Sequence, residues 1–351
     1  MEVIIGQRIH NSRVHKGLSM QEVADNIGVS KQMINKYEQG KSMPTSEKLI
    51  ALSKLFQQKV DYFFRKPEVI IGEISFRKKS KFGVKKVNAL KEEIRIQIEN
   101  YLFIENICEV NSTYKNPLQG NSIADEKQVK ESAKQLRNHW KIGQDAIHNM
   151  IDLLEDNNIK VIEVADETGS FDGLATIIDG KYHIIVIAKS MPVERKRFTL
   201  LHELAHLLLP IGGLEEKQQE KFCNIFASEM LLSEANVITE FGSSRSRISF
   251  EELKNIQEKY GISISAVVYK LGETKIMSQE RVKKFYQRLN FEPNLKLEVE
   301  QTRYEGLEHS NRYENLVYRA VSEELISMSK ASSLLQISLD NLKNKLTANI
   351  R

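Results

Sequence analysis

The sequence predicts an α+β fold that is mainly α-helical, with short helices near the N-terminal end, a small sheet in the middle and further helices towards the C-terminal end. Capped amphipathic stretches with helical spacing fill most of the 351 residues. Runs of β-branched residues interrupt this pattern at Ile159–Val164, Ala175–Ile178 and Tyr182–Ala188. Gly169–Gly173 and Asp179-Gly180 are expected to supply the turns. A long helical stretch follows at once, from about Pro192 to Leu209. A chain of this length has room for two or three domains, each with its own core.

The bulk composition is that of a soluble globular protein. Hydrophobic residues make up 41% and charged residues 28% of the chain. The longest apolar run, Leu200–Leu209, contains two histidines and a glutamate and is too short and too polar to span a bilayer. Cys108 and Cys223 do not make a disulfide framework, which favours a reducing compartment. We therefore expect a cytoplasmic protein with no membrane partner.

The charge is concentrated at one end of the chain. Residues 1–100 contain 19 Lys and Arg against 11 Asp and Glu, whereas the whole chain has a net charge of only +4. Surplus lysine is usually a solvated surface, but a basic N-terminal third also favours a polyanionic partner.

The N-terminal part of the chain predicts a helix-turn-helix. Ser19 and Glu22 form a capping box that starts one helix, and Gly28 is suited to end it. Ser30 then caps a second helix, Lys31–Gln39. Amides and amines on the exposed face of the second helix are the groups that contact base edges or phosphates in the major groove.

A longer string of residues extends this pattern. It consists of Gly6, Arg8, Ile9, Gly17, Leu18, Ser19, Val23, Ala24, Gly28, Val29, Ser30, Ile34, Tyr37, Glu38, Gly40, Pro44, Leu49 and Leu52. Over about residues 1–64 it resembles the XRE-type, Cro/repressor-like helix-turn-helix family. The resemblance implies a five-helix domain, often a homodimer, that binds a double-stranded DNA operator. The expected DNA contacts are Gln21, Lys31, Gln32, Asn35, Lys36 and Lys41. The alternative is a helical domain that packs against another protein.

The segment that follows is less informative. The basic run Arg77–Lys86 is either a solvated surface or an extension of the phosphate contacts, and both interpretations stay open. Val87–Val110 has helical periodicity, and Asn111–Ala124 is the best predicted linker. Asp125–Asn157 predicts two further amphipathic helices.

The predicted helix 192–209 carries a His-Glu-x-x-His motif. His202 and His206 are four residues apart, so both imidazoles lie on one helix face within about 40° of each other and are able to share a metal ion. Glu203 lies beside that position, where it is able to take a proton from water. Imidazole ligands suit Zn²⁺ best among the available ions. The alternative is two histidines on an ordinary amphipathic helix.

A third ligand is expected from the next predicted helix, Glu215–Leu232, which runs back along the first. Glu220 lies at a height comparable to His206, and Asn224 one turn later is a partner for a ligand. Glu216 and Glu229 are rivals, but Glu229 faces the other side of the helix. Two histidines and one glutamate leave a fourth position open, which is the catalytic arrangement.

The surrounding sequence strengthens this interpretation. The relevant residues are Phe171, Asp172, Gly173, Ile184, Ile185, Val186, Ile187, Arg195, Arg197, Phe198, Thr199, Leu200, His202, Glu203, Leu204, His206, Glu220, Asn224, Phe226, Ala227, Glu229, Met230, Leu231 and Leu232. Over roughly residues 120–280 the chain resembles the ImmA/IrrE-type metallopeptidases. The resemblance implies a zincin-like, gluzincin-type domain that binds Zn²⁺ and uses Glu203 as its base. Members on separate chains cleave helix-turn-helix repressors.

Three departures from the family pattern involve four residues. Ala205 stands where Gly is common, Phe222 and Cys223 replace a usual Glu-Ala pair, and Ser233 replaces a common Pro. None of these changes removes a proposed ligand, but Cys223 beside the site is a candidate for oxidation.

The C-terminal third contains two echoes of the first helix-turn-helix. Ser249–Leu271 has a capping box, a Gly turn and a second helix that is too apolar to contact DNA, so we expect it to be peptidase-domain core. Ser327–Leu342 matches the spacing of Ser19–Ile34 and is either an accessory binding element or a packing helix pair.

These observations predict four segments. A DNA-binding domain covers 1–66, a basic segment with a helix and linker covers 67–124, a metallopeptidase domain covers 125–285, and a helical region covers 286–351. The predicted function is a DNA-binding transcriptional regulator with a zinc-dependent endopeptidase that cleaves a repressor, or itself, in response to a signal. The alternative is a non-proteolytic transcription factor whose zincin-like domain serves as a sensor or dimerisation module.

Overall fold

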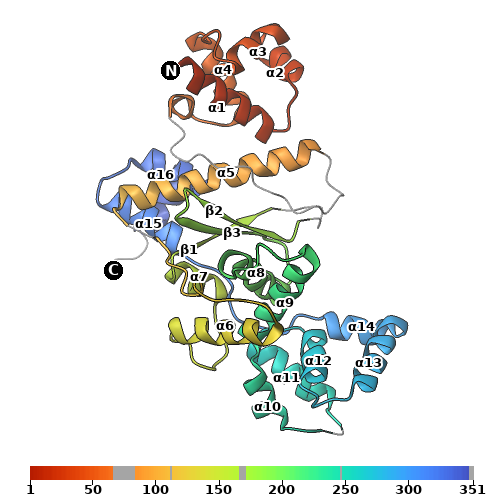
Figure 1. Ribbon diagram of the computed structural model, residues 1–351. Coiled ribbons are helices and arrows are strands. Elements are labelled where there is room, and N and C mark those ends of the chain that lie inside the picture. Colours follow the sequence, from red (N-terminus) through yellow and green to blue (C-terminus); the bar gives the residue numbers. More distant parts are fainter. Residues whose placement is uncertain (66–83, 111–112, 166–170, 246, 348–351) are drawn as a thin grey trace. The chain divides into compact units, whose positions relative to one another are not determined.

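The chain forms two compact units. In the computed structural model, residues 1–65, 84–110, 113–165, 171–245 and 247–347 are described. The first unit combines Met1–Asn111 with Tyr313–Arg351, and the second consists of Ser112–Arg312. The mainly helical α+β fold is confirmed, with one small sheet in the described residues (Figure 1).

The first unit begins with the expected helix-turn-helix domain. Its elements are α1 (Glu2–His15), α2 (Met20–Ile27), α3 (Lys31–Glu38), α4 (Ser46–Phe56) and a short 3-10 helix, η1 (Val60–Phe64). The predicted signals are confirmed, because Ser19 and Glu22 form a reciprocal capping box and Gly28 is left-handed at φ 66°. The Ser30 side chain accepts from the Met33 amide at the start of α3. The fifth helix of the expected domain is therefore the 3-10 helix η1.

The remainder of this unit joins two distant parts of the sequence. It contains α5 (Val84–Ile107), α15 (Arg312–Ser322), α16 (Met328–Leu335) and α17 (Leu339–Thr347). Their buried apolar side chains form one cluster, here called the α5 cluster: Ile104, Cys108, Leu316, Val317, Ala320, Ile326, Ala331, Leu334 and Leu342. The turn between α16 and α17 repeats the local geometry of the first motif, with Gln336 left-handed at φ 54° and Ser338 accepting from the Asn341 amide.

The second unit is built around a three-stranded sheet. Its strands are β1 (Ile159–Val164), β2 (Gly173–Ile178) and β3 (Tyr182–Ala188), in the order β1-β3-β2. β1 runs parallel and β2 antiparallel to β3. The predicted turn between β2 and β3 is confirmed, because Asp179 and Gly180 both have positive φ, as a tight hairpin requires. β3 is buried from His183 to Ala188, which agrees with the apolar run Ile184–Ala188.

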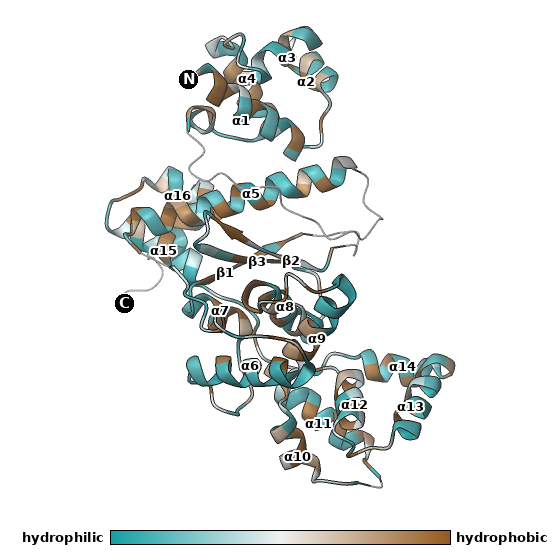
Figure 2. Cartoon of the chain, in the orientation of Figure 1, coloured by the Kyte–Doolittle hydropathy of each residue, from teal (hydrophilic) through white to brown (hydrophobic). Residues whose placement is uncertain are grey.

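Helices pack on this sheet and on one another. α8 (Val193–Leu208) contacts β2, β3 and α9 (Glu216–Leu231), and its apolar residues stand out in Figure 2. The other helices of the unit are α6 (Glu126–His139), α7 (Met150–Asp156), α10 (Glu234–Phe241), α11 (Phe250–Tyr260), α12 (Ile264–Glu273), α13 (Gln279–Phe291) and α14 (Pro293–Glu300). No helix in the described part of the chain combines the length and hydrophobicity that a membrane span requires.

Several expected boundaries shift. The helix expected at 87–110 runs from 84 to 107, and the strand expected at 175–178 begins at Gly173, which was expected to belong to a turn. The described part of the expected linker 111–124, residues 113–124, contains no helix or strand and packs within the second unit. Leu118 is fully buried, and the Asn116 side chain donates to the Leu208 carbonyl at 2.8 Å. Most of the basic run Arg77–Lys86 lies outside the described residues.

The first of the two helix-turn-helix echoes is core, as predicted. Ser249 and Glu252 form a capping box, Gly261 is left-handed at φ 59°, and Val267 and Val268 on α12 are fully buried. The boundaries predicted for the four segments stay a prediction, since compact units and functional domains need not coincide.

Candidate metal centre and DNA-contacting face

The predicted metal ligands lie where α8 packs along α9. Leu200, Leu201 and Leu204 are fully buried and attach α8 to the core. His202, Glu203 and His206 lie on the opposite side of α8 and are half-buried. Helical spacing therefore places the three polar side chains at the boundary between the core and solvent.

The two imidazoles converge on the carboxylate of Glu220. The Nε2 atoms of His202 and His206 are 3.1 Å apart. Glu220 Oε2 lies 3.2 Å from His202 Nε2, and Glu220 Oε1 lies 3.4 Å from His206 Nε2. Ligands around tetrahedral Zn²⁺, with bonds of about 2.0–2.2 Å, are separated by roughly 3.3–3.6 Å. The three atom pairs fit a site of that size, so the donor set present suits the ion.

The other nitrogen of each ring is held by a residue of α9. His202 Nδ1 lies 3.0 Å from Asn224 Oδ1, and His206 Nδ1 lies 3.2 Å from Cys223 Sγ. Such contacts fix the orientation of a ligating imidazole and leave Nε2 to face the ion. Asn224 thus lies where the sequence placed it, whereas the contact of Cys223 with His206 was not anticipated.

Cys223 is also a rival for a ligand position. Its sulfur and one nitrogen from each of His202 and His206 lie within 4.8 Å of one another. However, the Cys223 thiol contacts the Nδ1 side of His206, whereas Glu220 reaches the Nε2 atoms of both histidines. Glu220 is therefore a better third ligand than Cys223 for a single ion between the two Nε2 atoms.

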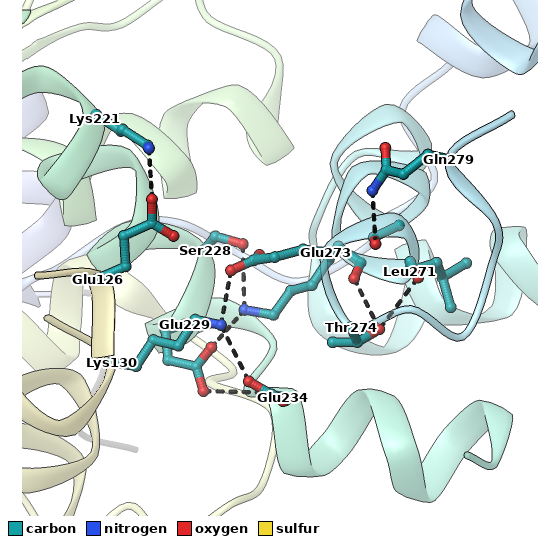
Figure 3. A network of polar contacts seen from close by, with 12 residues as sticks. Glu126, Lys130, Lys221, Ser228, Glu229, Glu234, Leu271, Glu273, Thr274 and Gln279 are labelled. Carbon is teal, nitrogen blue, oxygen red and sulfur yellow. Dashed lines mark hydrogen bonds and ion pairs between the residues drawn. The ribbon is translucent and has the colours of Figure 1, made fainter. Parts of the chain in front are cut away.

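The rival Glu229 is engaged elsewhere. Its carboxylate accepts from Lys270 Nζ at 2.6 Å, on a side of α9 where both side chains are nearly fully buried. Figure 3 shows Glu229 within a network of polar contacts. Burial lowers the pKa of Lys270, while the charge of Glu229 acts in the opposite direction. Glu216 is exposed in the first turn of α9. Glu229 therefore faces away from the histidines, as the helical spacing predicted.

Glu203 lies against the edge strand of the sheet. A Cβ atom placed on Gly173 would lie 3.1 Å from Glu203 Cγ and 2.9 Å from Thr199 Cγ2. Only glycine allows β2 to approach α8 this closely. Sequence reasoning assigned Gly173 to a turn and missed this contact, although Gly173 belonged to the string that carried the family resemblance.

The expected DNA-contacting residues form an exposed set. Gln21, Lys31, Gln32, Asn35, Lys36 and Lys41 are all exposed, whereas Ile34 and Tyr37 on the opposite side of α3 are buried. Arg13 on α1 donates to both carboxylate oxygens of Glu38 and fixes the end of α3. Burial of Glu38 disfavours its charged form, but the hydrogen bonds from Arg13 and His10 outweigh it and hold the pKa of Glu38 below its usual value. This contact joins α1 to α3, the helix that carries Lys31, Gln32, Asn35 and Lys36.

Comparison with known proteins gives two matches to family models. The model described as helix-turn-helix matches residues 9–63, and the peptidase family model described as IrrE N-terminal-like domain matches residues 154–272.

Curated relatives match over a short part of the chain. An uncharacterised HTH-type transcriptional regulator of Rickettsia prowazekii is 34% identical over 64 residues, which is 18% of this chain and 49% of the relative. A prophage-derived uncharacterised HTH-type transcriptional regulator of Bacillus subtilis is 34% identical over 62 residues, 18% of this chain and 57% of the relative. The chain thus spans about half the length of the curated relatives it matches.

A solved structure, the apo form of ComR from S. thermophilus, aligns over 100% of both chains with 12% identity and a TM-score of 0.18. This TM-score is too low for the alignment to carry an argument about the fold. The family matches and the architecture agree with the two resemblances found in the sequence. The chain therefore joins a DNA-binding helix-turn-helix domain of the transcription-regulator type to a domain of the IrrE N-terminal-like peptidase family.

Proposed function

We propose that this chain is a transcriptional regulator with a zinc-dependent endopeptidase that cleaves a protein, either a repressor or the chain itself, in response to a signal. The observation that carries the proposal is the convergence of His202 Nε2, His206 Nε2 and the Glu220 carboxylate within 3.1–3.4 Å of one another, with Glu203 adjacent. Cys108 and Cys223 form no disulfide bond with each other, and we expect the chain to work in a reducing cytoplasm.

The side chains at the site have different roles in the proposed peptide hydrolysis. His202, His206 and Glu220 would hold Zn²⁺, which supplies Lewis-acid polarisation of the substrate carbonyl and activates water. Glu203 accepts the proton of the attacking water and passes it to the leaving amine. Asn224 and Cys223 keep the two imidazoles oriented.

The sheet offers a place for an extended substrate. β2 is an edge strand of the described sheet, since it pairs with β3 alone, and it approaches Glu203 at Gly173. An extended peptide is able to add to such an edge through main-chain hydrogen bonds. The substrate would then lie beside the base.

The test is a cleavage assay with zinc-loaded protein, incubated with itself and with helix-turn-helix repressors. Glu203→Gln is expected to retain zinc and the fold and to lose cleavage by roughly 10²–10⁴-fold, because an amide does not accept the proton. Glu220→Gln is expected to lose zinc, and Glu216→Gln, one turn away on α9, is the matched control that keeps both properties. Equal cleavage by the wild type and Glu203→Gln rules Glu203 out as the base. Zinc binding without cleavage of any protein would instead favour the sensor or dimerisation alternative.

A further inference from the structure

A large cavity within the first unit is separate from the metal centre and from the DNA-contacting face. Its volume is about 950 Å³, and it lies among the end of α1, the α4–η1 turn, α5 and α16. Volumes of about 300–1,000 Å³ are typical of sites for small molecules and cofactors. The cavity wall is therefore formed by the helix-turn-helix domain together with α5 and α16, a helix near the C-terminal end of the sequence.

The wall carries excess positive charge. Its described lining contains five Lys and Arg residues but only two carboxylates, Asp61 and Glu99. Both carboxylates are already engaged, Glu99 with Arg8 at 2.6 Å and Asp61 with Arg65. The three lysines contact other groups. Lys16 donates to the Gln57 side chain at 2.7 Å, Lys59 donates to the Ser329 hydroxyl at 2.5 Å, and Lys330 lies 4.3 Å from the centre of the Phe103 ring. An anionic ligand would balance these charges.

Two further features favour anionic oxygen atoms. The Tyr62 hydroxyl is buried and has no hydrogen-bond partner among the described residues, although its residue lines the cavity and is only 8% exposed. The first turn of α16 also borders the cavity, and a helix N-terminus favours negative charge. Burial and the nearby charges of Lys16 and Arg95 lower the pKa of His15, which is consistent with a positive potential here.

Beside the charged and the uncharged polar side chains, part of the wall is apolar. It is made of Phe56, Ile96, Phe103, Leu325, Ile326 and Ile337. These side chains suit a flat ring system, since aromatic and aliphatic groups pack against ring faces. The cavity thus has a basic polar portion and an apolar portion large enough for a ring.

We propose that this cavity binds a small effector with the chemistry of a nucleotide, in which phosphate groups contact Lys59, Lys330 and Tyr62 and the base packs against the apolar wall. Such a ligand contacts the helix-turn-helix domain and the C-terminal helices together. It would therefore favour the arrangement of the first unit in which the cavity is closed around it, and this gives the regulator an input that does not pass through the peptidase site.

The experiment is calorimetric titration of the full chain with nucleoside mono-, di- and triphosphates, with adenosine and with inorganic triphosphate. At least one nucleotide is expected to bind, and the matching nucleoside and the free triphosphate are expected to bind at least tenfold more weakly. A variant with His202→Ala and His206→Ala is expected to bind equally well, which separates this site from any metal-bound nucleotide.

Substitutions locate the site. The double variant Lys59→Gln, Lys330→Gln is expected to weaken binding at least tenfold, and Tyr62→Phe several-fold. The control removes the same charge at two exposed lysines outside the cavity, Lys54→Gln with Lys283→Gln. Absence of binding by every nucleotide at millimolar concentration overturns the proposal. Equal weakening by the cavity and control variants does so as well, since it shows general charge attraction.

Discussion

The two imidazoles of the candidate metal centre are held by neighbours of very different chemistry. An amide oxygen of Asn224 contacts one ring, and the thiol of Cys223 contacts the other. Groups in this position tune metal affinity because they fix the ring and its tautomer.

Removing either contact should therefore weaken zinc binding. Asn224→Ala and Cys223→Ala are each expected to lower zinc affinity by about 10–100-fold, measured by competition with a chelator. Cys108→Ala is the matched control, because Cys108 is buried in the α5 cluster of the first unit and donates to the Leu316 carbonyl. Unchanged zinc affinity in both site variants would show that the rings need no such support.

Gly173 allows a second test at a single residue. The added methyl group of Gly173→Ala collides with Thr199 and Glu203, so the base is displaced while the ligands on α8 and α9 stay in place. Cleavage should fall by roughly 10²-fold, as expected for a base about 1 Å out of position, with zinc content unchanged. Gly120→Ala is the control, since no atom lies within 4 Å of an added Cβ there. Full activity of Gly173→Ala would remove the close approach of β2 from the mechanism.

The parts of the site whose geometry depends on residues close in sequence could be predicted, whereas contacts between separate elements could not. His202, Glu203 and His206 share one helix, so their spacing alone defines their geometry. To predict Glu220 as the third ligand, it was enough to assume that α9 runs back along α8. The contacts of Cys223 and Gly173 depend on the packing of separate elements, which spacing along the chain does not determine.

Helix α3 is the element on which the DNA-binding hypothesis depends. Gln32→Ala or Asn35→Ala in the full chain is expected to reduce preference for particular bases by about 1–3 kcal/mol, and to leave non-specific affinity nearly unchanged. Lys36→Ala should weaken binding to all sequences and reduce the salt dependence by about one ion. Gel-shift titrations at several salt concentrations measure both effects, with Lys283→Ala on α13 as the control. A sequence selection that enriches no motif would favour the protein-interaction alternative.

Between α12 and α9 lies a buried ion pair, and we expect that breaking it lowers the free energy of unfolding strongly. Lys270 Nζ and Glu229 Oε2 are 2.6 Å apart, and both side chains are nearly excluded from solvent. Lys270→Met leaves a buried carboxylate without its partner, which costs about 3–5 kcal/mol of the free energy of unfolding. Thermal unfolding tests this, with the exposed pair Lys284 and Glu280 as the comparison. A melting temperature as little changed by Lys270→Met as by Lys284→Met would contradict the prediction.

Individual helices and turns were easier to predict from the sequence than the helices against which they pack. The capping boxes at Ser19 and Ser249 and the turn at Asp179-Gly180 are local signals, and each is confirmed. The helix 84–107 was also recognisable from its periodicity, but its packing against the last helices of the chain was not, because more than 200 residues separate them.

At the scale of the whole molecule, the first unit depends on contacts between the two ends of the sequence. Leu342 on α17 is fully buried in the α5 cluster, whereas Leu339 on the same helix is 43% exposed. Leu342→Ala is expected to cost about 2–5 kcal/mol, and Leu339→Ala less than about 0.5 kcal/mol. Chemical denaturation followed by circular dichroism measures the difference. Equal effects of the two substitutions would mean that the C-terminal helices do not pack on α5.

The first unit consists of two chain segments separated in sequence by residues 112–312, and this affects what self-cleavage would release. If the peptidase cuts its own chain anywhere in the inserted segment 112–312, the α5 cluster still joins α5 of one fragment to α15 and α17 of the other. The cut molecule would then migrate as two bands in denaturing gels but elute as a single particle in native chromatography. Cleavage inside that segment would therefore leave the helix-turn-helix fragment attached, and its release would require a cut on the N-terminal side of α5.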